Sequence, residues 1–147
     1  MNLEFSLIPF GQLTAVIPAL LPYLNKSEFW THKRAHVDDI VAFLFSNQMQ
    51  LWVAYEKDSN KVYGHVVTEV KQYPRVKMLV LQYIAAEDHT MKWVQDKVFA
   101  TLENYAKDTH CAGIEALGRP GWEPYMKKQN YTVKTMCYEK YFSEVAT

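Results

Sequence analysis

The apolar residues of this chain change their spacing twice, and that change restricts the fold more than any other feature. Between residues 13 and 44 they recur at the helical spacing of one buried face. Between residues 51 and 84 they form short runs rich in valine, tyrosine and leucine, which are typical of strands. The helical spacing then returns over residues 88–107. This alternation predicts a mixed α/β fold.

The predicted elements follow the order β-α-α-β-β-β-α-β-α-β. A hairpin combined with β-α-β crossovers implies a mixed sheet with helices on both faces. Pro18 is expected to kink or restart the first helix, because proline lacks an amide hydrogen. Asp88 or Thr90 is expected to cap the long central helix. The predicted ranges are residues 3–8, 13–24, 37–44, 51–55, 61–73, 76–84, 88–107, 113–117, 122–129 and 131–142.

Length and composition restrict the classes of function. A chain of 147 residues is the usual size of one domain, so residues 1–147 are predicted to form a single domain. Sixteen basic residues balance sixteen acidic ones, which argues against a nucleic-acid protein with a broad basic surface. Neutrality also favours association between copies, and tyrosine and tryptophan are abundant, as at protein interfaces.

The sequence shows no signal for export, for membrane insertion or for metal binding. The N-terminus lacks the basic region of a signal peptide, and the apolar stretch at residues 13–24 is short for a membrane span. Cys111 and Cys137 form no metal-ligand spacing with histidines or with each other. We therefore expect a cytoplasmic protein with reduced cysteines and no metal.

The order of elements, together with three local segments, resembles the GNAT acetyltransferase superfamily. The segments are residues 62–66 (VYGHV), 83–87 (YIAAE) and 122–131 (WEPYMKKQNY). The resemblance implies a fold in which two central strands splay apart and acetyl-CoA occupies the gap. The pyrophosphate would lie at the start of the central helix, where amides face an anion. The implied cofactor-binding residues are Tyr83, Ile84, Ala85, His89, Thr90, Met91 and Lys92.

The sequence departs from the GNAT pattern at two functional positions. GNAT enzymes open the central helix with glycines that let phosphates approach the backbone, whereas residues 88–94 (DHTMKWV) contain no glycine. The usual general-acid tyrosine of the late helix aligns with Met126, and Tyr125 lies one residue earlier. Because one residue rotates a helical side chain by about 100°, Tyr125 can serve only if the helix is re-registered.

Three further residues are candidates for deprotonating an attacking amine, and each has a structural alternative. Glu69 occupies a strand position that can face a substrate or simply water. Glu115 lies in an apolar strand and needs a partner, which Arg119 can supply as an ion pair. His65 can act as a base near neutral pH or satisfy a structural role.

A second resemblance concerns residues 113–131, where GRPGW at 118–122 precedes the last predicted helix. This segment, together with the glycine-free central helix and its Trp93, is similar to small GNAT-like proteins of tailed bacteriophages. The resemblance implies a phage protein, in the host cytoplasm or the virion, and does not itself define an activity. Together with the missing glycines, the displaced tyrosine and the abundant aromatic residues, it favours a protein without robust catalysis that contacts phage structural or assembly proteins or a second copy. The alternative is an active acetyl-CoA-dependent N-acyltransferase acting on a primary amine.

Overall fold

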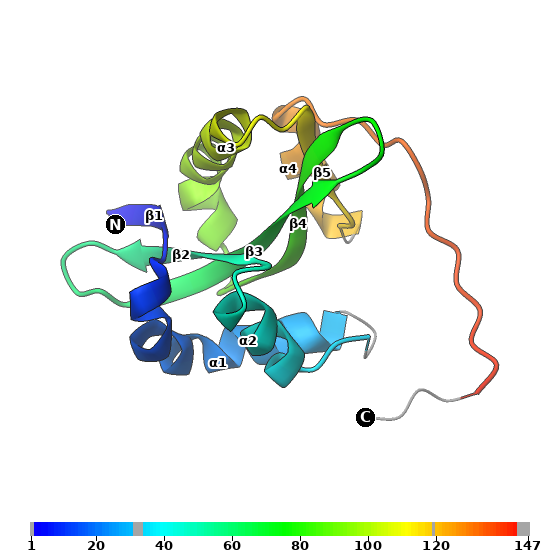
Figure 1. The fold of residues 1–147 in the computed structure, drawn as a ribbon. Coiled ribbons are helices and arrows are strands. Elements are labelled where there is room, and N and C mark those ends of the chain that lie inside the picture. The colour runs from blue at the N-terminus through cyan, green and yellow to red at the C-terminus, as the bar shows by residue number, and fades with distance from the viewer. Residues whose placement is uncertain (1, 31–33, 119, 144–147) are drawn as a thin grey trace. The chain divides into compact units, whose positions relative to one another are not determined.

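The computed structural model describes residues 2–30, 34–118 and 120–143. The chain divides into two compact units, Met1–Ala116 and Leu117–Thr147. Figure 1 shows the course of the chain and the labels of its elements. The first unit holds the sheet and the three longer helices, so it also holds most of the predicted site residues.

Five strands of the first unit form one mixed sheet in the order β1-β2-β3-β4-β5. Each neighbouring pair among β1 to β4 is antiparallel. Strand β5 is parallel to β4, because a helix connects the two. The predicted mixed sheet is therefore confirmed. The strands are β1 (Leu3–Leu7), β2 (Gln50–Glu56), β3 (Val62–Gln72), β4 (Lys77–Ala86) and β5 (Gly113–Ala116).

Helices cover both faces of this sheet, as the sequence predicts. Helices α1 (Leu13–Trp30), preceded by the short η1 (Phe10–Gln12), and α2 (Val37–Phe45) lie on one face, and α3 (Thr90–Asp108) lies on the other (Figure 1). Helix α1 is one continuous helix with two prolines inside it. The expected restart at Pro18 does not occur. Both Pro18 and Pro22 fall on the exposed side of the helix, where water can hydrate the carbonyls that lose their amide donors.

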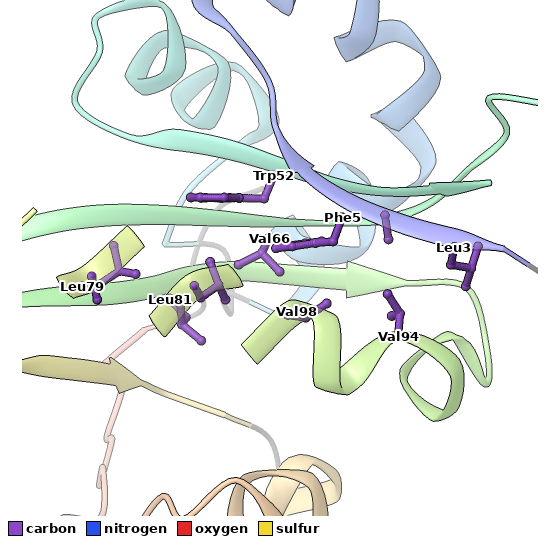
Figure 2. Close-up of a cluster of buried hydrophobic side chains, with 11 residues drawn as sticks. Leu3, Phe5, Trp52, Val66, Leu79, Leu81, Val94 and Val98 are labelled. Atoms are coloured by element: carbon purple, nitrogen blue, oxygen red, sulfur yellow. The ribbon is translucent and has the colours of Figure 1, made fainter. Parts of the chain in front are cut away.

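Two hydrophobic clusters hold the layers together, one on each face of the sheet. On the α3 face, Trp52 of β2 stacks on Phe5 of β1 with ring centroids 5.7 Å apart, and α3 packs over them through Val94 and Val98 (Figure 2). On the α1 face, fully buried leucines of both helices pack against the central strands. Each fully buried leucine contributes about 1.5–3 kcal/mol through its burial.

Gly64 allows β3 and β4 to approach closely at the end of the sheet. A Cβ at this position would lie 2.6 Å from the carbonyl oxygen of Ala85 and 2.7 Å from the Cα of Ala86. No side chain fits in that space without separating the strands, so the glycine fixes the local packing.

The second unit contains η2 (Pro120–Trp122) and α4 (Glu123–Lys128). The predicted strand at residues 131–142 is wrong, since residues 131–141 have no regular secondary structure, and Cys137 consequently lies in no strand. A strand needs a neighbour to bond its amides and carbonyls, and no strand pairs with this segment in the described part of the chain. The side chains of residues 132–142 are exposed, with Val133 at 71% and Tyr138 at 87%.

Candidate functional site

Two carboxylates predicted from the sequence lie on one face of the sheet. Glu69 of β3 pairs with Val80 of β4, and Val80 pairs in turn with Glu115 of β5. Two strand spacings of ~4.8 Å therefore separate the Cα atoms of the two glutamates by about 10 Å. Glu69 follows Val67 by two positions, so it projects from the face that α1 and α2 cover.

Each carboxylate is held by a neighbouring side chain that the sequence analysis missed. The Gln82 Nε2 donates a hydrogen bond of 2.9 Å to Glu69 Oε1. The Tyr73 hydroxyl donates a short hydrogen bond to Glu115 Oε1, and this bond raises the pKa of Tyr73. The expected partner of Glu115, Arg119, lies outside the described residues. A strand register would have been needed to identify Tyr73 and Gln82 from the sequence.

Tyr83 lies beside these carboxylates with its phenol group protonated. Burial raises the pKa of Tyr83, and the negative charges of Asp39 on α2 and Glu69 raise it further. No described residue hydrogen-bonds to the Tyr83 hydroxyl, so this proton is available to a ligand. Tyr83 was predicted only as a backbone contact for a cofactor, and the structure adds a hydroxyl on the face that carries Glu69.

The backbone of β4 has an unpaired edge immediately next to this group. Strand β5 pairs with β4 only from Met78 to Leu81, whereas β4 continues to Ala86. Among the described residues, no strand pairs with the β5 side of residues 82–86, because β5 ends the sheet. The predicted cofactor residues Tyr83, Ile84 and Ala85 all lie on this open stretch.

The start of α3 differs from the cap predicted from the sequence. Its N-cap is His89, in the left-handed region with φ of 66° and no side-chain cap, instead of Asp88 or Thr90. The chain leaves β4 in a tight turn, where the Thr90 amide donates to the carbonyl of Glu87 at 3.2 Å. The Lys92 amide donates to the carbonyl of His89 at the same distance. Two amides that could face an anion are therefore already engaged.

Side chains around the start of α3 carry charges of both signs. His89 and Lys92 are exposed and can attract phosphate groups, whereas the exposed carboxylates of Glu87 and Asp88 repel them. The side chain of Met91, also predicted to contact a cofactor, lies outside the described part of the structure. The edge of β4 thus offers unpaired backbone groups, whereas the start of α3 offers an anion mainly side chains.

His65 is buried in the interior, away from solvent. It is 2% exposed, its Nε2 lies 3.1 Å from Ser27 Oγ of α1, and no described residue bonds its Nδ1. Burial lowers the pKa of His65 to about 4, so the imidazole is neutral at pH 7.

Tyr125, the candidate general acid, lies in α4 of the second unit. Its side chain is half-buried, and its ring centroid is 6.2 Å from that of Trp122.

Comparisons with known proteins identify the fold but no sequence family. No family model matches the sequence, and no curated protein is significantly similar to it. Among solved structures, a GNAT family acetyltransferase from Staphylococcus aureus is similar with a TM-score of 0.65 and 13% identity, covering 97% of this chain and 100% of that one. An acetyltransferase from Trypanosoma brucei has a TM-score of 0.67 and 9% identity, over 96% and 100% of the two chains.

A third structure contains the expected cosubstrate. A predicted acetyltransferase from Clostridium acetobutylicum, solved with acetyl-CoA, has a TM-score of 0.65 and 12% identity over 95% and 96% of the chains. Identities this low show the fold alone, so the chain has the GNAT fold that the sequence predicts. Within the described residues, no helix is long and apolar enough to cross a membrane, and no three metal-binding side chains gather.

Proposed function

We propose that this protein transfers an acyl group from an acyl-CoA thioester to an amine. One observation carries the proposal: Glu69 and Glu115 share a face of the sheet at the point where β5 ends and β4 continues unpaired. A GNAT fold alone would not support it, because function resides in sites and not in folds.

The open edge of β4 is the proposed seat of the pantetheine arm. The backbone groups of Tyr83, Ile84 and Ala85 would hydrogen-bond the arm as an additional strand does. Lys92 would supply positive charge and His89 a ring N–H donor for the phosphates, in place of a glycine loop. The bound acyl-CoA supplies the activated carbonyl carbon, and the remaining steps fall to side chains of the chain itself.

Glu69 and Tyr83 carry the proposed proton transfers. Glu69 accepts a proton from the amine as its nitrogen bonds to the thioester carbon. The carbon–sulfur bond breaks, and the protonated Tyr83 hydroxyl donates a proton to the leaving thiolate. Glu115 stays hydrogen-bonded to Tyr73 and attracts the acceptor as its ammonium ion, which loses one proton to solvent to become the neutral amine that attacks. The products are an amide and free CoA, and Glu69 then returns its proton through solvent to the Tyr83 phenolate, so both residues regain their starting protonation states.

Calorimetric titration with acetyl-CoA is the first test, followed by an acyl-transfer assay with a panel of amines. We expect micromolar binding, and a loss of about 10²–10⁴-fold in kcat for Glu69→Gln, the range that general acid–base groups contribute. Glu103→Gln on α3 is the matched control and should retain full activity. Absence of binding at millimolar acetyl-CoA would contradict the proposal.

A second proposed function is a non-catalytic role in the assembly of a phage particle. It is supported by the start of α3, where no glycine occurs, two amides are engaged and two carboxylates repel phosphate. The exposed aromatic residues of segment 131–142 also favour contact with another protein, a phage structural protein or a second copy. This function predicts no heat with acetyl-CoA and recovery of the protein with purified phage particles.

A further inference from the structure

A small pocket on the α3 face has a lining that no step of the proposed acyl transfer uses. It encloses about 130 Å³ between the start of α3, the beginning of β1 and the start of β3. Figure 2 shows this end of the α3 face, where Leu3 lies beside Val94. The lining residues are Leu3, Tyr63, Glu87, Asp88, Thr90 and Trp93.

The chemistry of the lining favours an organic cation. Two aromatic residues, Tyr63 and Trp93, offer π faces, and Trp93 is 67% exposed although tryptophan is costly to leave in water. Two carboxylates, Glu87 and Asp88, add negative charge. The Tyr63 ring already attracts an ammonium group of this chain, since Lys61 Nζ lies 4.8 Å from its centroid.

Thr90 supplies an independent indication of a ligand. Its side chain is buried to 4% exposure and lines the pocket, yet no described residue hydrogen-bonds to its hydroxyl. The hydroxyl oxygen is not one of the fully enclosed polar atoms, so it opens onto the pocket, where it can accept a hydrogen bond from an N–H group of a ligand. An ammonium ion with N–H donors satisfies Thr90 and the carboxylates together, whereas a quaternary ammonium ion satisfies only the rings.

Lys61 occupies one face of the Tyr63 ring, so a ligand cation would use the other face. Lys97 is directed elsewhere, because its Nζ donates to the carbonyl of Leu3 at 2.7 Å and approaches Glu4 Oε1 at 3.4 Å. The Glu87 Oε2 accepts a weak hydrogen bond of 3.4 Å from Tyr23 and retains further acceptor capacity. A metal ion is disfavoured, since the described residues gather no three histidine, cysteine or acidic ligands.

We propose that this pocket binds the ammonium group of a small primary or secondary alkylamine. The rings of Tyr63 and Trp93 flank the cation, and the carboxylates of Glu87 and Asp88 balance its charge. The Thr90 hydroxyl oxygen accepts a hydrogen bond from one of its N–H groups. The site is separate from the carboxylates Glu69 and Glu115, which lie on the opposite face of the sheet. It is therefore independent of the acyl transfer proposed above.

The test is an amide and indole chemical-shift titration of the full chain with 1,4-diaminobutane, without acyl-CoA. We expect saturable shifts centred on Thr90 and on the Trp93 indole. Tetramethylammonium should bind several-fold more weakly, because it has no N–H donor. Shifts centred on Glu69 and Gln82 instead, equal affinity for tetramethylammonium, or no saturable shifts at all would each overturn the proposal.

Substitutions make the test specific for the lining. Thr90→Val keeps the buried shape and should weaken binding about fivefold, the value of one hydrogen bond. Asp88→Asn should weaken it about threefold, as expected for an exposed ion pair. Asp108→Asn, at the far end of α3, is the matched control and should bind like the wild type. Wild-type affinity in folded Thr90→Val and Asp88→Asn variants would overturn the assignment.

Discussion

The two faces of the sheet bury polar side chains in different ways. On the α3 face, Trp52 Nε1 donates to Thr68 Oγ1 at 2.9 Å, and Thr68 donates to Gln50 Oε1 at 2.9 Å. On the α1 face, His65 reaches only Ser27, and no described residue bonds its second nitrogen. The first arrangement lies entirely within neighbouring strands, so the sheet register satisfies it. The second depends on how α1 docks.

The largest expected effect that separates the faces is a pH dependence of stability carried by His65. Its pKa is about 4 in the folded protein, because burial disfavours the charged form. The unfolded chain takes up the proton near the ordinary value of 6.5, so stability falls as the pH drops below ~6.5 and stops falling near 4. The linked loss is on the order of 3 kcal/mol.

Urea unfolding between pH 7 and pH 4 measures this loss, and His65→Leu should abolish most of the slope in that window. His110→Asn, at an exposed position with a left-handed backbone, is the matched control and should retain the slope. An unchanged slope in His65→Leu would show that other groups carry the acid sensitivity, and the proposed difference between the faces would fail.

Thr68→Val is expected to have the next largest effect. The substitution preserves the side-chain shape but leaves the buried Trp52 indole N–H without its acceptor and Gln50 without its donor. An unsatisfied buried group costs about 1–3 kcal/mol, so we expect the free energy of unfolding to fall by about 2 kcal/mol at neutral pH. A loss near zero would mean that water replaces the hydroxyl on this face as well.

Ser27→Ala is expected to have the smallest effect of the three. It leaves one buried group, the His65 Nε2, without a partner, whereas Thr68→Val leaves two, so we expect a loss of about 1 kcal/mol. Thermal or urea unfolding at pH 7 measures the change, with Thr14→Ala on the exposed side of α1 as control. A loss larger than that of Thr68→Val would reverse the ranking of the two faces.

The sequence predicts the fold well where apolar spacing alone decides the structure. The helix at Val37–Phe45, the hairpin of β2 and β3, and the long α3 all appear as expected, because each buries a periodic face. Segment 131–142 has the spacing of a strand and still forms none. Alternation shows only that a segment is able to pair, and pairing depends on a neighbour that the sequence does not reveal.

Only part of the candidate site could be predicted from the sequence, because the strand register decides which of its side chains come together. Glu69 and Glu115 were identifiable as unusual strand carboxylates, but only the pairing through Val80 brings them to one face. Tyr73 and Gln82 had no distinguishing pattern. The β-bulge between Val67 and Thr68 shifts the register of β4 and brings Gln82 within hydrogen-bonding distance of Glu69, and no local signal marks it.

The prolines inside α1 affect how that helix responds to its surroundings. Neither Pro18 nor Pro22 has an amide hydrogen, so the carbonyls of Thr14 and Pro18 lose their intrahelical donors on the side exposed to water. Solvent hydrates these carbonyls, and the helix can bend there without breaking further hydrogen bonds. We therefore expect α1 to bend more easily than α3, although α1 packs against His65 through Ser27. Amide hydrogen exchange should consequently be faster along the middle of α1 than along α3.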